Sequence, residues 1–333
     1  MRKSTFLSTA MLGVMFTLLL HAAPARAQNL VSWVASNGSG STCTRAAPCA
    51  TFAAAHDATL AGGEINCVDA GNYGPVAILK SISIVCDNTE AGITPAPGFG
   101  FTTSNGVIIR AMSNATVTLT GLDIDGGTSG QGSTGILFQS GAALHLNKVK
   151  IRNIVNVSGD AGGIYFQPSA YAELYVTDSV ITENGGTGSL SGGIIIQPVG
   201  SGGVNASINR VRVDNNSTGI IVNSTSAGVN ATLVDSVVAG NQADGLLAQS
   251  GSAAANVNFD HSVASGNFGS GLRAAGATAT VRINNSTIVN NVTGVSTANA
   301  GQLQSFKNNM IAGNIVDGTP ITTFPGPGGT PLQ

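Results

Sequence analysis

The chain has 333 residues, of which 9% are charged, 5% are aromatic and 45 residues are glycine. Its 14 Lys and Arg are outnumbered by 16 Asp and Glu, which argues against nucleic acid as a partner, because phosphates require a basic face. Its polarity comes from Asn, Ser, Thr and Gly on a β-branched background, a composition typical of a large core built without helices.

Residues 1–27 are predicted to be a signal peptide. Arg2 and Lys3 precede an apolar run from Leu7 to Leu20, and a small-x-small cleavage site ends at Ala27. The run is too short to span a membrane, and no later apolar stretch approaches the length of about 18 residues that spanning needs. We therefore expect a secreted or periplasmic protein without a transmembrane segment, whose net charge after cleavage is about −5 (11 basic minus 16 acidic residues).

Residues 28–63 are predicted to form an N-terminal cap. The Ala-rich segment from Thr51 to Leu60 has the pattern of a short amphipathic helix, and Pro48 lies just before it, where helices commonly begin. A stack of repeats needs its open ends covered, which gives this segment a purpose.

Cysteines occur only in the first third of the chain, at Cys43, Cys49, Cys67 and Cys86. An even number in an exported protein predicts disulfides. The pairs Cys43–Cys49 and Cys67–Cys86 are favoured because each closes a short loop. Zinc is the alternative, but the spacing contains no C-x-x-C pair and no paired histidine lies nearby.

The rest of the chain, residues 64–317, repeats a glycine followed by three apolar residues and an amide. The copies are Gly135–Gln139, Gly163–Gln167, Gly193–Gln197, Gly219–Asn223 and Gly245–Gln249, with weaker copies at Gly271 and Gly294. Successive glycines are 28, 30, 26, 26, 26 and 23 residues apart. Asparagine keeps the same period four residues earlier, at Asn215, Asn241, Asn267 and Asn290. A fixed period of this length indicates a repeat architecture.

Short β-branched runs with a period of two lie between the glycines, for example Ala231–Val238 and Val257–Ala264, and predict strands joined by tight turns. One such unit cannot close its own core, so units must stack strand over strand, about 4.8 Å apart. No unit has a helical period, which excludes leucine-rich and ankyrin repeats, and a sandwich would not keep residue types in phase. We therefore predict an all-β, single-stranded, right-handed parallel β-helix over residues 64–317. Its stacked amides are expected to share hydrogen bonds: Gln139, Gln167, Gln197, Asn223 and Gln249.

On these repeats the chain resembles the pectin-lyase-like superfamily of right-handed parallel β-helices, and secreted bacterial β-helix-repeat proteins of uncharacterised function. The catalytic motifs of that superfamily are absent, including Asn-Thr-Asp of polygalacturonases, Arg-x-Pro-x-x-Arg of pectate lyases and Asp-Pro-His-Glu of alginate epimerases. The resemblance therefore implies the fold and a role with extracellular polysaccharide, and leaves catalysis open.

Three successive coils have longer linkers before the repeated glycine: Gly126 to Gly135, Asn153 to Gly163 and Asn184 to Gly193. Insertions in a solenoid commonly mark its working face, so these loops are predicted to wall a groove. Drift is the alternative, because Gly- and Ser-rich insertions cost little.

Charged residues gather on the strands beside these loops. Aligning the segments that begin at Leu122, Val149, Val180 and Val211 turns their apolar residues inward. Two outward columns result: Asp123, Lys150, Ile181 and Arg212 in one, and Asp125, Arg152, Glu183 and Asp214 in the other.

The charged members of these columns are the candidate catalytic residues. In a lyase of the resembled superfamily, the carboxylates would hold Ca²⁺ against a uronate and an Arg or Lys would act as base. In a hydrolase, two carboxylates would flank the bond. No other cofactor is expected. The alternative is a ladder of salt bridges that only stabilises the sheet, with Asp123 over Lys150 and Asp125 over Arg152.

The glycine strands predict an outward apolar stripe about 20 Å long at one strand spacing per coil. Its members are the candidate binding residues Leu137, Tyr165, Ile195, Ile221 and Leu247. An exposed stripe of this size commonly marks a partner surface, here for self-association. Alternatively, the Pro- and Gly-rich tail, residues 318–333, covers the stripe.

A self-assembling structural solenoid is disfavoured by the predicted caps at the ends of the stack. Two other functions remain open. The chain binds or cleaves an extracellular polysaccharide over residues 122–214, or it is a non-catalytic surface, matrix or adhesin-like protein that associates through the apolar stripe.

Overall fold

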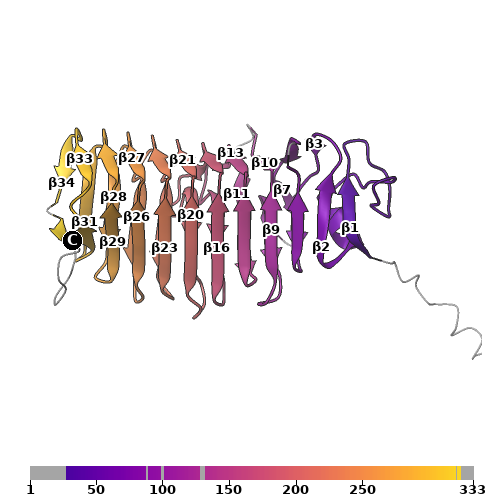
Figure 1. Ribbon diagram of the computed structural model, residues 1–333, viewed down its shortest axis with the longest axis horizontal. Helices are drawn as coiled ribbons and strands as arrows, with labels where there is room; N and C mark the ends of the chain where they lie inside the picture. The colour runs from indigo at the N-terminus through magenta and orange to yellow at the C-terminus, as the bar shows by residue number, and fades with distance from the viewer. Residues whose placement is uncertain (1–27, 88, 99–100, 128–131, 320, 324–333) are drawn as a thin grey trace, which may run out of the picture.

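The structure is a computed structural model that describes residues 28–87, 89–98, 101–127, 132–319 and 321–323. The predicted signal peptide and most of the predicted tail lie outside the described residues. The coils follow one another along a single long axis, from the N-terminal to the C-terminal end of the described chain (Figure 1). Within these residues, no helix has both the length and the apolar character that a membrane crossing requires.

The strands of successive coils form three sheets (Figure 1). The long-strand sheet has 12 strands, in the order β1 (Asn29–Val34), β2 (Thr59–Cys67), β5 (Ile82–Val85), β9 (Thr116–Thr120), β12 (Ala143–Asn147), β16 (Ala172–Thr177), β20 (Val204–Asn209), β23 (Val229–Val234), β26 (Ala255–Asp260), β29 (Ala279–Asn284), β32 (Gln302–Ser305) and β35 (Thr322–Thr323). The short-strand sheet has 10, in the order β3 (Gly71–Asn72), β6 (Ala91–Ile93), β10 (Leu122–Asp125), β13 (Lys150–Arg152), β17 (Val180–Thr182), β21 (Arg212–Asp214), β24 (Val237–Ala239), β27 (Val263–Ser265), β30 (Thr287–Val289) and β33 (Met310–Ala312).

The glycine-strand sheet has 11 strands and carries the repeated glycine motif. Its order is β4 (Val76–Ile78), β8 (Phe101–Arg110), β11 (Gly132–Ser140), β15 (Gly162–Phe166), β19 (Gly192–Ile196), β22 (Ile220–Ser224), β25 (Leu246–Ser250), β28 (Ser270–Ala275), β31 (Thr293–Ala298) and β34 (Val316–Gly318), with β7 (Ala96–Gly98) antiparallel to β8. A small parallel pair, β14 (Val155–Asn156) and β18 (Gly185–Gly186), lies in two of the inserted loops. The all-β parallel β-helix that the repeat predicts is confirmed.

Like residues of successive coils are superposed, as predicted. Tyr165 pairs in register with both Leu137 and Ile195, and the N–H of Gln197 donates to the carbonyl of Phe166. Amide-to-amide hydrogen bonds within the glutamine stack are not found among the described residues. Instead, the Tyr165 hydroxyl donates to Gln197 Oε1 at 2.9 Å.

An amide ladder exists, but it lies in the turn between the short-strand and glycine-strand sheets. The ladder asparagines are Asn184, Asn216, Asn241, Asn267, Asn291 and Asn314. The side-chain oxygen of Asn184 accepts from the backbone N–H of Ile154. In every later member it accepts from both the backbone N–H and the Nδ2 of the asparagine one coil earlier, as Asn267 does from Asn241 at 3.1 and 2.8 Å. Each Nδ2 also donates to an earlier backbone carbonyl, as Asn267 does to Val238. The ladder therefore pairs buried backbone groups that would otherwise be costly to bury.

The predicted asparagine period was displaced by one residue at two coils. Asn215 and Asn290 have positive φ angles of 55° and 59° and form the corner, while the next residue in each coil enters the ladder. Gly240 and Gly266 occupy the same corner in other coils, each with φ of 64°. Asparagine and glycine both tolerate this left-handed conformation, which explains their alternation there.

The repeated glycine is required by its neighbours in space. A Cβ built on Gly245 would lie 2.7 Å from Asn267 Nδ2 and 2.7 Å from the carbonyl oxygen of Gly271, one coil later. Gly219 would meet the Gly245 carbonyl at 2.3 Å. The period visible in the sequence thus reflects close approach of consecutive backbones beside the amide ladder.

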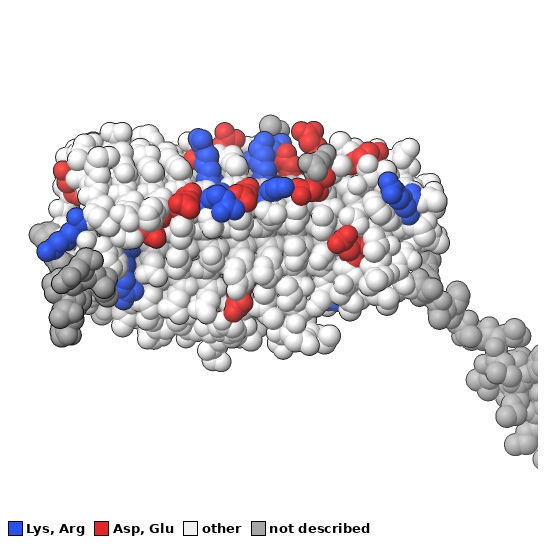
Figure 2. All heavy atoms as spheres, in the orientation of Figure 1, with Lys and Arg blue, Asp and Glu red and all other residues white. Residues whose placement is uncertain are grey.

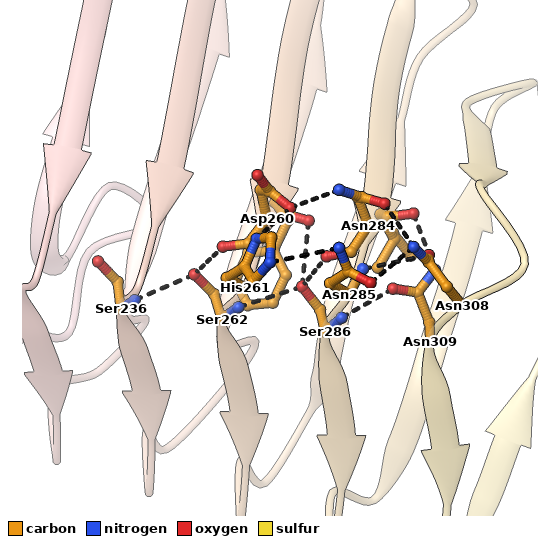
Figure 3. Close-up of polar contacts among 11 residues, drawn as sticks. Ser236, Asp260, His261, Ser262, Asn284, Asn285, Ser286, Asn308 and Asn309 are labelled. Carbon is orange, nitrogen blue, oxygen red and sulfur yellow. Dashed lines mark hydrogen bonds and ion pairs between the residues drawn. The ribbon is translucent and has the colours of Figure 1, made fainter. Parts of the chain in front are cut away.

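A second ladder runs along the turn between the long-strand and short-strand sheets. In the C-terminal coils, the backbone N–H groups of Ser236 and Ser262 donate to the hydroxyls of Ser262 and Ser286, and that of Ser286 donates to Asn309 (Figure 3). The residue before each of these serines has a positive φ, as at His261 (45°). His261 is therefore a turn residue.

The N-terminal coil contains the helix and the disulfides that the sequence predicts. Helix α2 (Phe52–Ala58) begins after Thr51, whose hydroxyl accepts from the Ala54 N–H at 3.2 Å. The helix packs against β1, β2 and β4. Disulfides join Cys43 to Cys49 and Cys67 to Cys86, so the favoured pairing is confirmed.

Candidate functional site

Charged side chains gather along one edge of the molecule, over its middle coils (Figure 2). They lie on β10, β13 and β21 and on the turns that precede short strands. The name charged band is used here for ten residues: Asp87, Asp123, Asp125, Lys148, Lys150, Arg152, Asp178, Arg210, Arg212 and Asp214. Six of the seven candidate catalytic residues belong to it.

The predicted alignment of the charged columns is confirmed for three coils and wrong for one. Lys150 pairs with Asp123 and Arg152 with Asp125, and the following coils place Arg212 and Asp214 in the same two columns. In the coil between them, however, Val180 and Thr182 occupy the columns.

The coil of β17 is displaced by one residue relative to the prediction. Ile181 points inward and is fully buried, while Glu183 lies in the corner with a φ of 58°. Ser179 takes the inward position that Val149 has one coil earlier. Its hydroxyl accepts a hydrogen bond from the Val149 N–H at 3.1 Å. Glu183 is therefore outside the two columns.

Arg152 joins both aspartates of the preceding coil. Its Nη1 lies 2.6 Å from Asp123 Oδ1, and its Nη2 lies 2.9 Å from Asp125 Oδ2. Burial disfavours the charged form of Asp125, but hydrogen bonds from Asn153 and the Gly127 N–H, together with the charge of Arg152, lower its pKa overall. Hydrogen bonds from Arg152 to Asp123, opposed by burial, raise the pKa of the guanidinium. The three charges therefore form a closed cluster.

This cluster does not fit the calcium site that the resemblance implies. Asp123 and Asp125 both direct their carboxylates at Arg152, whose charge occupies the place that a cation between them would need. No group of three or more His, Cys, Asp or Glu side chains suited to a metal occurs in the described part of the chain. We therefore derive no chemistry through Ca²⁺.

Arg212 and Asp214 pair along a single strand, with Nη2 2.7 Å from Oδ2. The guanidinium of Arg212 donates a hydrogen bond to Asp214 Oδ2. This bond raises the pKa of the guanidinium. The Asp214 side chain is 7% exposed, whereas that of Arg212 is 63% exposed. The cation thus lies outside its carboxylate.

Two further ion pairs lie on the turn between the long-strand and short-strand sheets. Arg210 donates to both carboxylate oxygens of Asp178, at 2.7 and 2.9 Å, and these bonds lower the pKa of Asp178. Lys148 reaches Asp87, 3.2 Å away, across the coil between them, because that coil has Gly121 at this position. The side chains of Lys148 and Arg210 are 54% and 53% exposed, against 39% for each carboxylate.

Two hollows lie near the charged band, and three of its residues line the first of them. The first, of about 420 Å³, is lined by Asn72, Glu90, Thr94, Asp123, Asp125 and Arg152, among others. The second, of about 390 Å³, is lined by the inserted loops and the corners after them, including Val155, Asn156, Glu183, Asn215, Ser217 and Gln242. The loops predicted to wall a groove therefore do border a hollow, and Glu183 faces it.

The side chains of the apolar stripe lie in register on successive strands, as predicted, but most of them are not exposed to solvent. Its members pair in register from Leu137 to Leu247. Leu137, Ile195 and Ile221 are buried, at 6%, 0% and 1% exposure. The inserted loops carry β14 and β18, which lie beside β11, β15 and β19, the strands of Leu137, Tyr165 and Ile195.

Tyr165 is partly buried as well. Burial, together with the nearby Asp160 of an inserted loop, raises its pKa to about 12. The stripe is therefore not a free surface over these coils, and the prediction of self-association through it loses its basis.

A polar aromatic cluster on the long-strand sheet was not predicted. It consists of His145, Tyr171, Glu173, Tyr175 and Asn205. The signal was present in the alternation Tyr-Ala-Glu-Leu-Tyr over residues 171–175, which places three polar side chains on one face of a strand.

The chain matches no protein-family model and no curated protein. Among solved structures, it is similar to the crystal structure of pectate lyase Pel9A, with a TM-score of 0.54 and 18% identity over 90% of this chain and 80% of that chain. The chain has the fold of a parallel β-helix. The A-module of the Azotobacter vinelandii mannuronan C-5 epimerase AlgE4 is also similar, with a TM-score of 0.41 and 14% identity over 79% of this chain and 91% of that chain. The likeness to Pel9A confirms the predicted resemblance at the level of the fold.

Proposed function

We propose that this chain is a non-catalytic binding protein for an acidic extracellular polysaccharide, which it contacts along the charged band. The observation that carries the proposal is the layering of charge. In the pairs Lys148–Asp87, Arg210–Asp178 and Arg212–Asp214, the cation is the more exposed partner. An anionic chain approaching this edge meets ammonium and guanidinium groups first.

Lys150 adds a cation that has no carboxylate partner among the described residues, and its side chain is exposed. Guanidinium groups already oriented by carboxylates beneath them lose little freedom on binding a second carboxylate. The band and the two hollows extend from β3 to β24, six strand spacings or about 29 Å. That length accommodates several sugar units of a linear chain.

Binding is favoured over cleavage because five of the seven candidate catalytic residues, all except Lys150 and Glu183, are engaged in ion pairs. Arg152 neutralises two aspartates, and Arg212 neutralises Asp214. A catalytic acid or base must be free to exchange a proton with the substrate. The proposal includes no cofactor. It also includes a secreted or periplasmic location, which the two disulfides support because such bonds persist in oxidising compartments.

The test is calorimetric titration of the chain with hexagalacturonate and with oligomannuronate at low and high salt. Binding is expected to weaken as salt rises, because the contacts are between exposed charges. The double variant Lys150→Gln, Arg212→Gln is expected to bind at least about tenfold more weakly, a loss of about 1.4 kcal/mol. The matched control is Arg282→Gln, which removes one cation from the long-strand sheet and should leave the affinity unchanged.

Product formation distinguishes binding from catalysis. Incubation of the same oligosaccharides with the chain, with and without Ca²⁺, should give no unsaturated product and no new reducing ends. Cleavage would disprove the non-catalytic role, and a failure to bind any acidic oligosaccharide would disprove the proposal altogether.

A further inference from the structure

A second surface with a different chemistry lies on the outer face of the long-strand sheet. The rings of His145 and Tyr175, from the adjacent strands β12 and β16, are stacked with centroids 4.5 Å apart and planes 6° apart. On the next strand, the residue in register with Tyr175 is Ser207, which is exposed. The stack therefore ends at Tyr175, and only a small side chain stands opposite the outer face of its ring.

The ring of Tyr175 is held in a fixed orientation. Its hydroxyl donates to Glu173 Oε2 at 2.8 Å, and the Tyr171 hydroxyl donates to Glu173 Oε1, also at 2.8 Å. These two bonds lower the pKa of Glu173, which remains a carboxylate. Burial lowers the pKa of His145, so the ring beneath Tyr175 is neutral at neutral pH.

A row of amides leads away from the cluster along the stack. Asn205 Nδ2 donates to the Tyr171 hydroxyl at 2.9 Å, Asn230 donates to Asn205 at 3.3 Å, and Asn256 donates to Asn230 at 3.1 Å. Each amide has two N–H donors, so each keeps one donor for a ligand. The row is in register, so these donors recur once per coil, about 4.8 Å apart.

We propose that this surface, from Tyr175 along Asn205, Asn230 and Asn256, binds a neutral oligosaccharide. One pyranose ring would lie over Ser207 against the free face of Tyr175, and the following sugar hydroxyls would bond to the amide row. An aromatic face with a few oriented polar groups is the usual composition of a small-ligand site. The only charge in the cluster is the carboxylate of Glu173, which disfavours an acidic sugar.

This site is independent of the charged band, which lies on other strands. The two proposals therefore fail separately. Variants of the band should leave the binding of a neutral sugar unchanged, and variants of the aromatic cluster should leave the binding of an acidic sugar unchanged.

The experiment is calorimetric titration of the full chain with cellohexaose, mannohexaose and chitohexaose, with hexagalacturonate as the acidic comparison. At least one neutral hexasaccharide is expected to bind. Tyr175→Ala should weaken that binding about tenfold or more, while Tyr175→Phe, which keeps the ring, should weaken it less. Lys150→Gln should have no effect.

Ser207→Tyr separates a binding role from a purely structural one. The added ring would extend the His145–Tyr175 stack and should raise the unfolding midpoint, since cross-strand aromatic pairs stabilise sheets. It would also fill the place proposed for the sugar, so the neutral hexasaccharide should no longer bind. Binding that survives Tyr175→Ala or Ser207→Tyr, or a failure of all three neutral hexasaccharides to bind, would overturn the proposal.

Discussion

The coils from β10 to β21 and those from β23 to β32 share one backbone plan but differ in what their turns and short strands carry. In the first group, the short strands and the turns before them hold ion pairs, with Arg152 between two aspartates. In the second group, the short strands β24, β27 and β30 carry no charged residue, and the turns hold the serine and asparagine ladders that both groups share, such as Ser236 to Asn309 (Figure 3). The ladders are common to both groups, whereas the ion pairs of the short strands are confined to the first. Ladders that satisfy the backbone are sufficient for stacking, whereas charge and long loops occur together on a few coils.

The largest expected effect is in the amide ladder. Asn267→Ala removes four side-chain hydrogen bonds, with Asn241 (two), Val238 and Asn291, and leaves buried groups without partners. We expect a loss of about 3 kcal/mol in the free energy of unfolding, measured by urea denaturation. The control Asn256→Ala, in the exposed amide row, should cost less than about 0.5 kcal/mol. Equal losses in the two variants would contradict the importance of the buried ladder.

The next effect is at the closed charge cluster. Arg152→Gln leaves Asp123 and Asp125 facing each other without a counterion, and we expect a loss of about 2 kcal/mol, between the values for exposed and buried pairs. Millimolar Ca²⁺ should then raise the unfolding midpoint of the variant and not that of the natural chain. A calcium response in both proteins would show that Arg152 does not exclude the ion.

Acid should act on the two groups of coils differently. The folded-state pKa values of Asp125 and Asp178 are lowered, so their contribution to stability is complete above the ordinary aspartate pKa and is lost as the pH falls through the lowered values. As the pH falls below the ordinary aspartate pKa, the coils of the charged band should therefore lose amide-exchange protection before the coils from β23 to β32 do. Hydrogen exchange at pH 6 and pH 3 measures this, and a uniform loss of protection would refute it.

The smallest effect is expected for Lys148→Ala. The ammonium of Lys148 and the carboxylate of Asp87 are 54% and 39% exposed, and such pairs contribute little to stability. The unfolding midpoint should stay within experimental error. A clear drop would show that the charges of the band act together as a network rather than as separate pairs.

The fold could be predicted from the sequence because steric demands recur with each coil. The repeated glycine reports the close approach of Gly219 to Gly245 and of Gly245 to Gly271, and this signal needs no knowledge of distant contacts. The disulfides were predictable for a related reason, since both close short loops.

The register of single residues could not be predicted where neighbouring residues are chemically alike. Asn215 and Asn216 are both asparagine, so the sequence does not tell which one forms the corner and which one enters the ladder. Similarly, Val180 and Ile181 are both β-branched and apolar, and only the three-dimensional register shows that Ile181 faces the core. The burial of most of the apolar stripe depends on the three-dimensional arrangement of the coils, and no local pattern encodes that.

The amide ladder also determines how this molecule can change in length. The side chain of each ladder asparagine bonds within its own coil or to an adjacent coil, and Asn241 and Asn267 occupy equivalent places 26 residues apart. Excision of the segment between them would bring Asn216 against Asn267 with the same geometry. The molecule can therefore be shortened or lengthened by whole coils, in steps of about 4.8 Å, and a family of such rods would differ in reach while keeping one cross-section.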